Sequence, residues 1–244
     1  MSEDVHQKAI KCCQVALSCI EKQDFKEALT QLDKAISLEP TDANFHFQRG
    51  IALMHMIRYQ DAVDAFERSL RYDDKNAIAM LYNGINYLFM GRYSKAIPCF
   101  DQALEIEPNN VMALSHKGSC LSEIDRHAEA IVCFDKILAE NPQDINSLFA
   151  KGVSLLKLQA FEDARNAFKA IIKMNPDDDE SWFELGNAFM GMKKYEDAIK
   201  CFDRVIKIEP NHMEVWDAKV ECLRALGRND EADEVAAKRE ADMW

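Results

Sequence analysis

Two stretches of the chain, 102 residues apart, carry nearly the same sequence. Arg92 to Pro108 reads RYSKAIPCFDQALEIEP, and Lys194 to Pro210 reads KYEDAIKCFDRVIKIEP. Nine of the 17 positions are identical, and 102 is three times 34. Self-similarity at a fixed period of this size indicates an array of stacked repeats.

The period of 34 runs along the whole chain without an insertion or a deletion. Rows of 34 that start at Ala9 predict repeats over residues 9–42, 43–76, 77–110, 111–144, 145–178 and 179–212, and a degenerate capping repeat over 213–244. Position 20 is alanine in every row: Ala28, Ala62, Ala96, Ala130, Ala164, Ala198 and Ala232. Position 24 is Leu32, Phe66, Phe100, Phe134, Phe168, Phe202 and Ala236. Position 8 is glycine in five rows, and proline stands at position 32 in five.

Each row contains two apolar periodic segments separated by a short polar turn, which predicts a helical hairpin. The small residues at positions 8 and 20 would let the two helices approach closely, and the proline would end the second helix. One hairpin cannot bury both of its faces, so neighbouring hairpins must stack. The run Asp4–Gln7 offers a capping box, so the first helix is expected to begin near Val5.

This pattern resembles the tetratricopeptide repeat (TPR), and the resemblance covers residues 1–244 as one superhelical domain. It implies an all-α fold, an α-solenoid of stacked antiparallel helical hairpins with a right-handed superhelical path. Chaperone-binding members of the family hold a partner's carboxylates with a clamp that needs Lys at position 5. No row has Lys there, so we expect a TPR protein of non-clamp type.

The composition excludes several classes of function. A formal net charge of −12 argues against nucleic-acid partners and anionic membrane surfaces. No run of about 18 apolar residues predicts a membrane span. The start MSEDVHQKAI lacks the pattern of a signal peptide, and the eight cysteines form no CxxC pair. We therefore expect reduced thiols, a cytoplasmic location and no membrane insertion.

The sequence predicts no catalytic, cofactor or metal site. The six histidines do not recur at one repeat position, and no Cys-His cluster has the spacing of zinc ligands. Phosphate-binding loops and the nucleophile-elbow motif are both missing. Because the repeats occupy the whole length, the sequence predicts a protein that is not an enzyme.

The resemblance implies that positions 2, 5, 9 and 12 of the first helix in each hairpin line a concave face. Positions 5, 9 and 12 share one helical stripe, which is apolar in most rows and polar in the fourth, where serine occupies all three positions. An apolar stripe indicates a peptide-binding groove, although packing between repeats would also explain it. The candidate groove residues are Phe47, Ile51, Met54, Leu81, Ile85, Leu88, Phe149, Val153, Phe183 and Asn187.

Two hypotheses for function remain. The first is a scaffold or adaptor whose groove binds a peptide segment of another protein. The acidic charge favours apolar segments flanked by basic residues. The alternative is a self-assembling scaffold, in which the groove or an end of the solenoid receives another copy.

Overall fold

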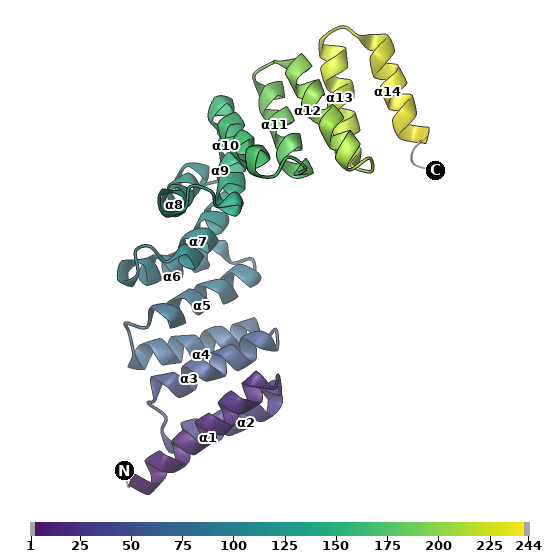
Figure 1. Cartoon of the computed structure of the whole chain (residues 1–244). Coiled ribbons are helices and arrows are strands. Elements are labelled where there is room, and N and C mark those ends of the chain that lie inside the picture. Colours follow the sequence, from purple (N-terminus) through teal and green to yellow (C-terminus); the bar gives the residue numbers. More distant parts are fainter. Residues whose placement is uncertain (1–2, 242–244) are drawn as a thin grey trace. The chain divides into compact units, whose positions relative to one another are not determined.

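The computed structural model describes residues 3–241, with side chains described for residues 4–238. These residues form fourteen α-helices and no strand, as the sequence predicts (Figure 1). The helices are α1 (Glu3–Glu21), α2 (Phe25–Leu38), α3 (Ala43–His55), α4 (Tyr59–Tyr72), α5 (Ala77–Phe89), α6 (Tyr93–Ile106), α7 (Val111–Glu123), α8 (His127–Glu140), α9 (Ile145–Lys157), α10 (Phe161–Met174), α11 (Asp179–Gly191), α12 (Tyr195–Ile208), α13 (Met213–Ala225) and α14 (Asn229–Ala241).

The helix boundaries repeat with the period of the sequence. From the second row on, the first helix of each hairpin (helix A) begins at position 1, and in every row the second (helix B) begins at position 17. The side chains of Asp42, Asn76, Asn110, Asp144 and Asp178, all at position 34, accept backbone hydrogen bonds at the starts of helices A. These caps satisfy N–H groups that have no partner within the helix.

The first helix departs from its expected start. It begins at Glu3 rather than near Val5. Asp4 does not cap it; its carboxylate pairs with Lys8 one turn later, at 2.7 Å. An acidic residue in the first turn is stabilised by the helix dipole, which suits this longer helix.

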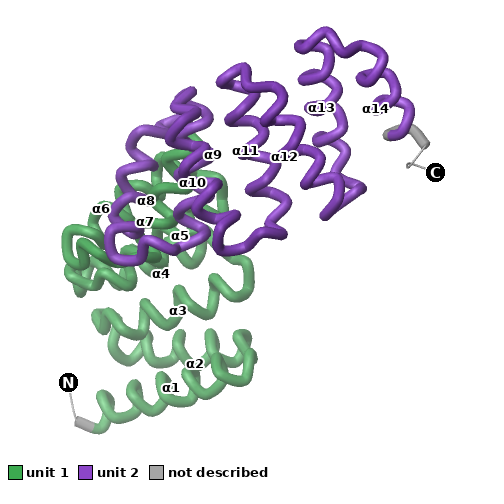
Figure 2. The backbone as a smooth tube through the Cα atoms, turned by 45° about the horizontal axis from the view of Figure 1, so that its top comes forward, with its two compact units in different colours: residues 1–124 green, residues 125–244 purple. Residues whose placement is uncertain are grey.

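The chain divides into two compact units (Figure 2). Unit 1 is residues 1–124 and contains α1–α7, and unit 2 is residues 125–244 and contains α8–α14. Within each unit every helix packs against the next along the chain. The boundary falls in the turn of the fourth predicted repeat, so a single domain over 1–244 stays a prediction.

The core of each unit is built from positions 8, 20 and 24. All seven position-20 alanines are fully buried, and so are Phe66, Phe100, Phe168 and Phe202. A Cβ atom placed on Gly50 would lie 2.6 Å from Cε1 of Phe66. Glycine therefore occupies position 8 because the phenylalanine ring of the same hairpin lies directly against the backbone.

Candidate peptide-binding face

The predicted groove residues of α3 are half-buried. The Phe47 ring centroid lies 5.7 Å from that of Phe66 and 6.1 Å from that of Tyr82. Ile51 and Met54 pack at the edge of the same cluster. These side chains thus contribute to packing and still present part of their surface to solvent.

The predicted residues of α5 are more buried than a groove requires. Leu81 and Ile85 are 6% and 7% exposed, and Leu88 is half-buried. The apolar stripe of candidate groove residues is therefore interrupted on α5, where packing between repeats covers the side chains of Leu81 and Ile85.

Other apolar side chains on helices A are exposed. At position 2, Ile78 of α5 is 52% exposed and Met112 of α7 is 50% exposed. On α1, both Ile10 and Leu17 are exposed. Positions 2 and 9 are seven residues apart and share one side of a helix. Sequence reasoning assigned position 2 to the concave face but did not select these residues, although their apolar character was a visible signal.

The serines of the fourth repeat form a polar segment on α7. Ser119 is exposed and its hydroxyl donates to the backbone carbonyl of Ser115, at 3.0 Å. The apolar surface of unit 1 is therefore bounded on α7 by hydroxyl groups.

The same face of unit 2 combines aromatic rings with carboxylates. Phe149 and Val153 of α9 are half-buried, and so is Phe183 of α11, whose ring centroid lies 4.9 Å from that of His212. Asn187 donates to the Glu184 carboxylate at 3.1 Å. Burial raises the pKa of Glu184, and the nearby Glu214 and Glu180 raise it further, against the hydrogen bond from Asn187 and the charge of Lys157.

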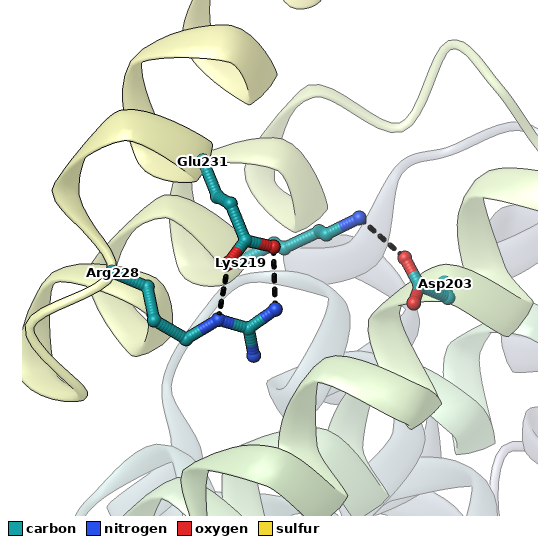
Figure 3. Close-up of polar contacts among 4 residues, drawn as sticks. All are labelled: Asp203, Lys219, Arg228 and Glu231. Carbon is teal, nitrogen blue, oxygen red and sulfur yellow. Dashed lines mark hydrogen bonds and ion pairs between the residues drawn. The ribbon is translucent and has the colours of Figure 1, made fainter.

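Two polar contacts recur along the chain, one between neighbouring hairpins and one in the turn within a hairpin, and Figure 3 shows one example of each. The inter-repeat ion pair joins position 7 of one repeat to position 25 of the preceding repeat. The pairs and their N–O distances are Arg49–Asp33 (2.9 Å), Lys117–Asp101 (2.5 Å), Lys151–Asp135 (2.5 Å) and Lys219–Asp203 (2.5 Å). The turn contact joins position 16 to position 19, as Arg228 does with Glu231.

No His, Cys, Asp or Glu residues within the described part of the chain gather into a group that could hold a metal ion. Residues 3–241 likewise contain no helix that is both long and apolar enough to cross a membrane.

Family models agree with the repeats. Models described as tetratricopeptide repeat match residues 77–110, 180–212 and 149–191, and one described as TPR repeat matches 16–56. The chain is a tetratricopeptide repeat protein. The search of curated proteins finds no match.

Solved structures share the fold of this TPR protein. YrrB, described as a TPR protein with an unusual peptide-binding site, is 22% identical over 77% of this chain and 97% of its own, with a TM-score of 0.71. MamA 41-end from Desulfovibrio magneticus RS-1 is 21% identical over 68% of this chain and 93% of its own, with a TM-score of 0.65. A TPR protein from Parabacteroides merdae ATCC 43184 is 18% identical over 96% of this chain and 93% of its own, with a TM-score of 0.70.

Proposed function

We propose that this TPR protein is a non-catalytic scaffold that binds an apolar peptide segment of a partner protein on the helix-A face of unit 1. The exposed apolar side chains Ile10, Leu17, Ile78 and Met112 carry the proposal. Ile78 and Met112 lie on helices A that contact each other, since α5 packs against α7, whereas Ile10 and Leu17 lie on α1, which packs against α3. Exposed apolar side chains gathered on one face are typical of interaction surfaces.

The net charge of the chain narrows the expected composition of the partner segment. With a net charge of −12, encounter favours a segment that also carries Lys or Arg. The acidic Glu180 and Glu214 on the corresponding face of unit 2 fit the same preference. All described cysteines are free thiols, which supports a cytoplasmic setting as part of the proposal. That YrrB is described with a peptide-binding site gives the proposal a precedent in the fold.

Selection from a displayed peptide library, followed by calorimetry, tests the proposal. We expect selected peptides to carry spaced Leu, Ile or Phe with basic flanks. The double variant Ile78→Asn/Met112→Gln should weaken their binding at least ten-fold. Ile106→Asn is the matched control, because Ile106 is also an exposed apolar residue of unit 1 but lies on helix B of its repeat. Equal loss in the control, or none in the double variant, would reject this face.

A second candidate, head-to-tail self-assembly, rests on the end face of the first repeat. Val15 occupies position 7, where four later repeats carry the base of the inter-repeat ion pair, and it is exposed. It lines a cavity of about 460 Å³ together with Lys8, Lys11, Lys34 and the apolar Leu38. At the other end of the chain, α14 exposes four acidic residues, Asp230, Glu231, Asp233 and Glu234.

Basic and acidic ends would attract each other in an open, non-closing contact. Light scattering over a concentration series tests this candidate, with Val15→Glu as the disrupting variant. A particle mass that grows with concentration and returns to the monomer value in Val15→Glu would support self-assembly. A monomer at all concentrations would reject it.

A further inference from the structure

A cavity of about 640 Å³ lies between α4, α5 and α6 of unit 1. Its polar lining includes Glu67 and Arg71 from α4, Asn83 and Tyr87 from α5, and Lys95 from α6. We propose that this cavity binds the side chain of a lysine or arginine from a partner protein. The site is distinct from the peptide-binding face, because Asn83 and Tyr87 stand about 140° and about 180° around α5 from Ile78.

The proposal starts from what occupies the same place in other repeats. Position 7 carries the base of the inter-repeat ion pair at four junctions, as Lys219 does in Figure 3. In the third repeat this position is Asn83, whose shorter side chain leaves the place of the cationic head group open. The carboxylate at position 25, Glu67, is still present.

Asn83 leaves an acceptor without a donor. The residue is 5% exposed, it lines the cavity, and its Oδ1 atom has no hydrogen-bond partner. A buried polar atom of this kind costs free energy until a donor reaches it. The missing partner is a hydrogen-bond donor, and a lysine side chain carries three N–H donors and an arginine side chain five.

Glu67 supplies the negative charge beside this acceptor. Its Oε1 accepts a hydrogen bond from the Tyr87 hydroxyl at 3.2 Å. Among the described residues it forms no ion pair, in contrast to Asp33, Asp101, Asp135 and Asp203. An incoming cation would therefore meet a carboxylate oxygen and a buried amide oxygen together. Leu70 and Pro98 in the cavity wall offer apolar surface for its methylene stem.

The turn contact is also altered at this cavity. Position 19 is Lys95 in the third repeat, whereas the remaining six repeats all have an acidic residue there, such as Glu231 in Figure 3. Lys95 Nζ lies 5.8 Å from the Tyr87 ring centroid, and Arg92 bonds to Gln60 instead of to position 19. The positive charges of Arg71 and Lys95 both oppose a cationic ligand, so removing the charge of Lys95 should strengthen binding.

Capped amino acids are the probes for the test. N-acetyl-lysine amide and N-acetyl-arginine amide are titrated into the whole ¹⁵N-labelled chain, and the amide signals of Asn83, Tyr87 and Lys95 are followed by NMR. We expect saturable shifts with a Kd on the order of 1 mM. N-acetyl-norleucine amide, which has an uncharged stem, should give none. A putrescine titration distinguishes a free amine from a side chain of a partner protein as the ligand. Tighter binding of putrescine than of the capped residues would identify the cavity as a site for a free amine and would reject the proposal.

Three variants decide the mechanism. Asn83→Lys restores the base found at four of the other junctions, so it should keep the melting temperature and weaken probe binding at least ten-fold. Lys95→Glu restores the usual acid and should tighten binding about three-fold or more. Lys151→Asn removes the base from the equivalent cavity of about 520 Å³ between α8, α9 and α10, and it should create a second site near Asp135.

The outcomes are exclusive. Shifts in the wild type that vanish in Asn83→Lys and grow in Lys95→Glu support the proposal. No shift in the wild type, unchanged binding in a folded Asn83→Lys variant, or preferential binding of N-acetyl-glutamate amide would overturn it. Because none of these variants touches Ile78 or Met112, the result is independent of the proposed peptide-binding face.

Discussion

The Nζ atom of Lys219 lies 2.5 Å from Oδ1 of Asp203, and this ion pair joins α13 to the preceding helix α12. The two residues are 16 apart, and the same spacing recurs in Arg49–Asp33, Lys117–Asp101 and Lys151–Asp135. In the Lys219–Asp203 pair the lysine is mostly covered and the aspartate is about half exposed. Because the pair is partly exposed, we expect it to contribute little to the free energy of unfolding.

A double-mutant cycle should measure this contact. We expect Lys219→Met and Asp203→Asn to couple by about 0.5 kcal/mol in urea unfolding at low salt, the range of partly exposed ion pairs. The coupling should fall in 1 M NaCl because salt screens the charges. The Arg228–Glu231 pair, which lies within one helix turn and is more exposed, serves as the reference and should couple less. Zero coupling at low salt would show that the Lys219–Asp203 ion pair does not contribute to the free energy of unfolding, despite its short N–O distance.

Gly50→Ala should destabilise unit 1. The added methyl group would sit 2.6 Å from Cε1 of Phe66, and relieving that overlap should cost about 1–3 kcal/mol. The double variant Gly50→Ala/Phe66→Leu should recover part of the loss, because the first repeat already pairs Ala16 with Leu32, both fully buried. Additive losses, measured by urea unfolding, would mean that the ring and the methyl group do not compete for space.

The repeat frame explains why the helices could be predicted so closely. Alanine at position 20 and phenylalanine at position 24 are forced by close packing, so their recurrence marks the same structural place in each hairpin. The inter-repeat ion pairs were missed although they follow the same frame. Charged residues occur on most helix surfaces, and their pairing becomes apparent only when positions 7 and 25 are compared across adjacent repeats.

Exposure on helices A was harder to predict. Periodicity places Ile85 and Ile78 on one side of α5, but it does not say how far neighbouring helices cover each. In the structure Ile85 is buried and Ile78 is exposed. The left-handed turn residue at position 15 was also missed, because five of its seven occupants are not glycine: Gln23, Ile57, Asp125, Gln159 and Lys193.

Ile57→Gly should stabilise the protein. Ile57 has φ of 61° and is exposed, so it combines an unfavourable backbone conformation with few packing contacts. A β-branched residue there costs about 1–2 kcal/mol, and glycine occupies the same position as Gly91 and Gly227. We expect a gain of about 1 kcal/mol in the free energy of unfolding. Gly91→Ile, the reverse change, should lose a similar amount, and a loss in both variants would contradict this explanation.

Alkaline pH should destabilise the fold through its buried thiols. Burial raises the pKa of Cys201 to about 12, and the charge of Asp197 adds to the effect. Burial likewise raises the pKa values of Cys120 and Cys222 to about 11. Well below pH 9, the ordinary pKa of a thiol, these thiols are neutral in both the folded and the unfolded chain. Between pH 9 and about 12 the unfolded chain ionises first, so the free energy of unfolding falls.

Cys201→Ala isolates the contribution of one thiol. At pH 7 the variant should be less stable by about 1 kcal/mol, because it loses buried apolar volume. Above pH 9 the free energy of unfolding of the wild type falls, because the Cys201 thiol ionises first in the unfolded chain. The variant lacks this thiol, so the difference in unfolding free energy between the two proteins should narrow. Val205→Ala is the matched control, since it removes fully buried apolar volume from the same helix without removing a thiol, so its difference from the wild type should not change with pH. A difference between wild type and Cys201→Ala that stays constant from pH 7 to pH 11 would show that Cys201 ionises equally well in the folded chain.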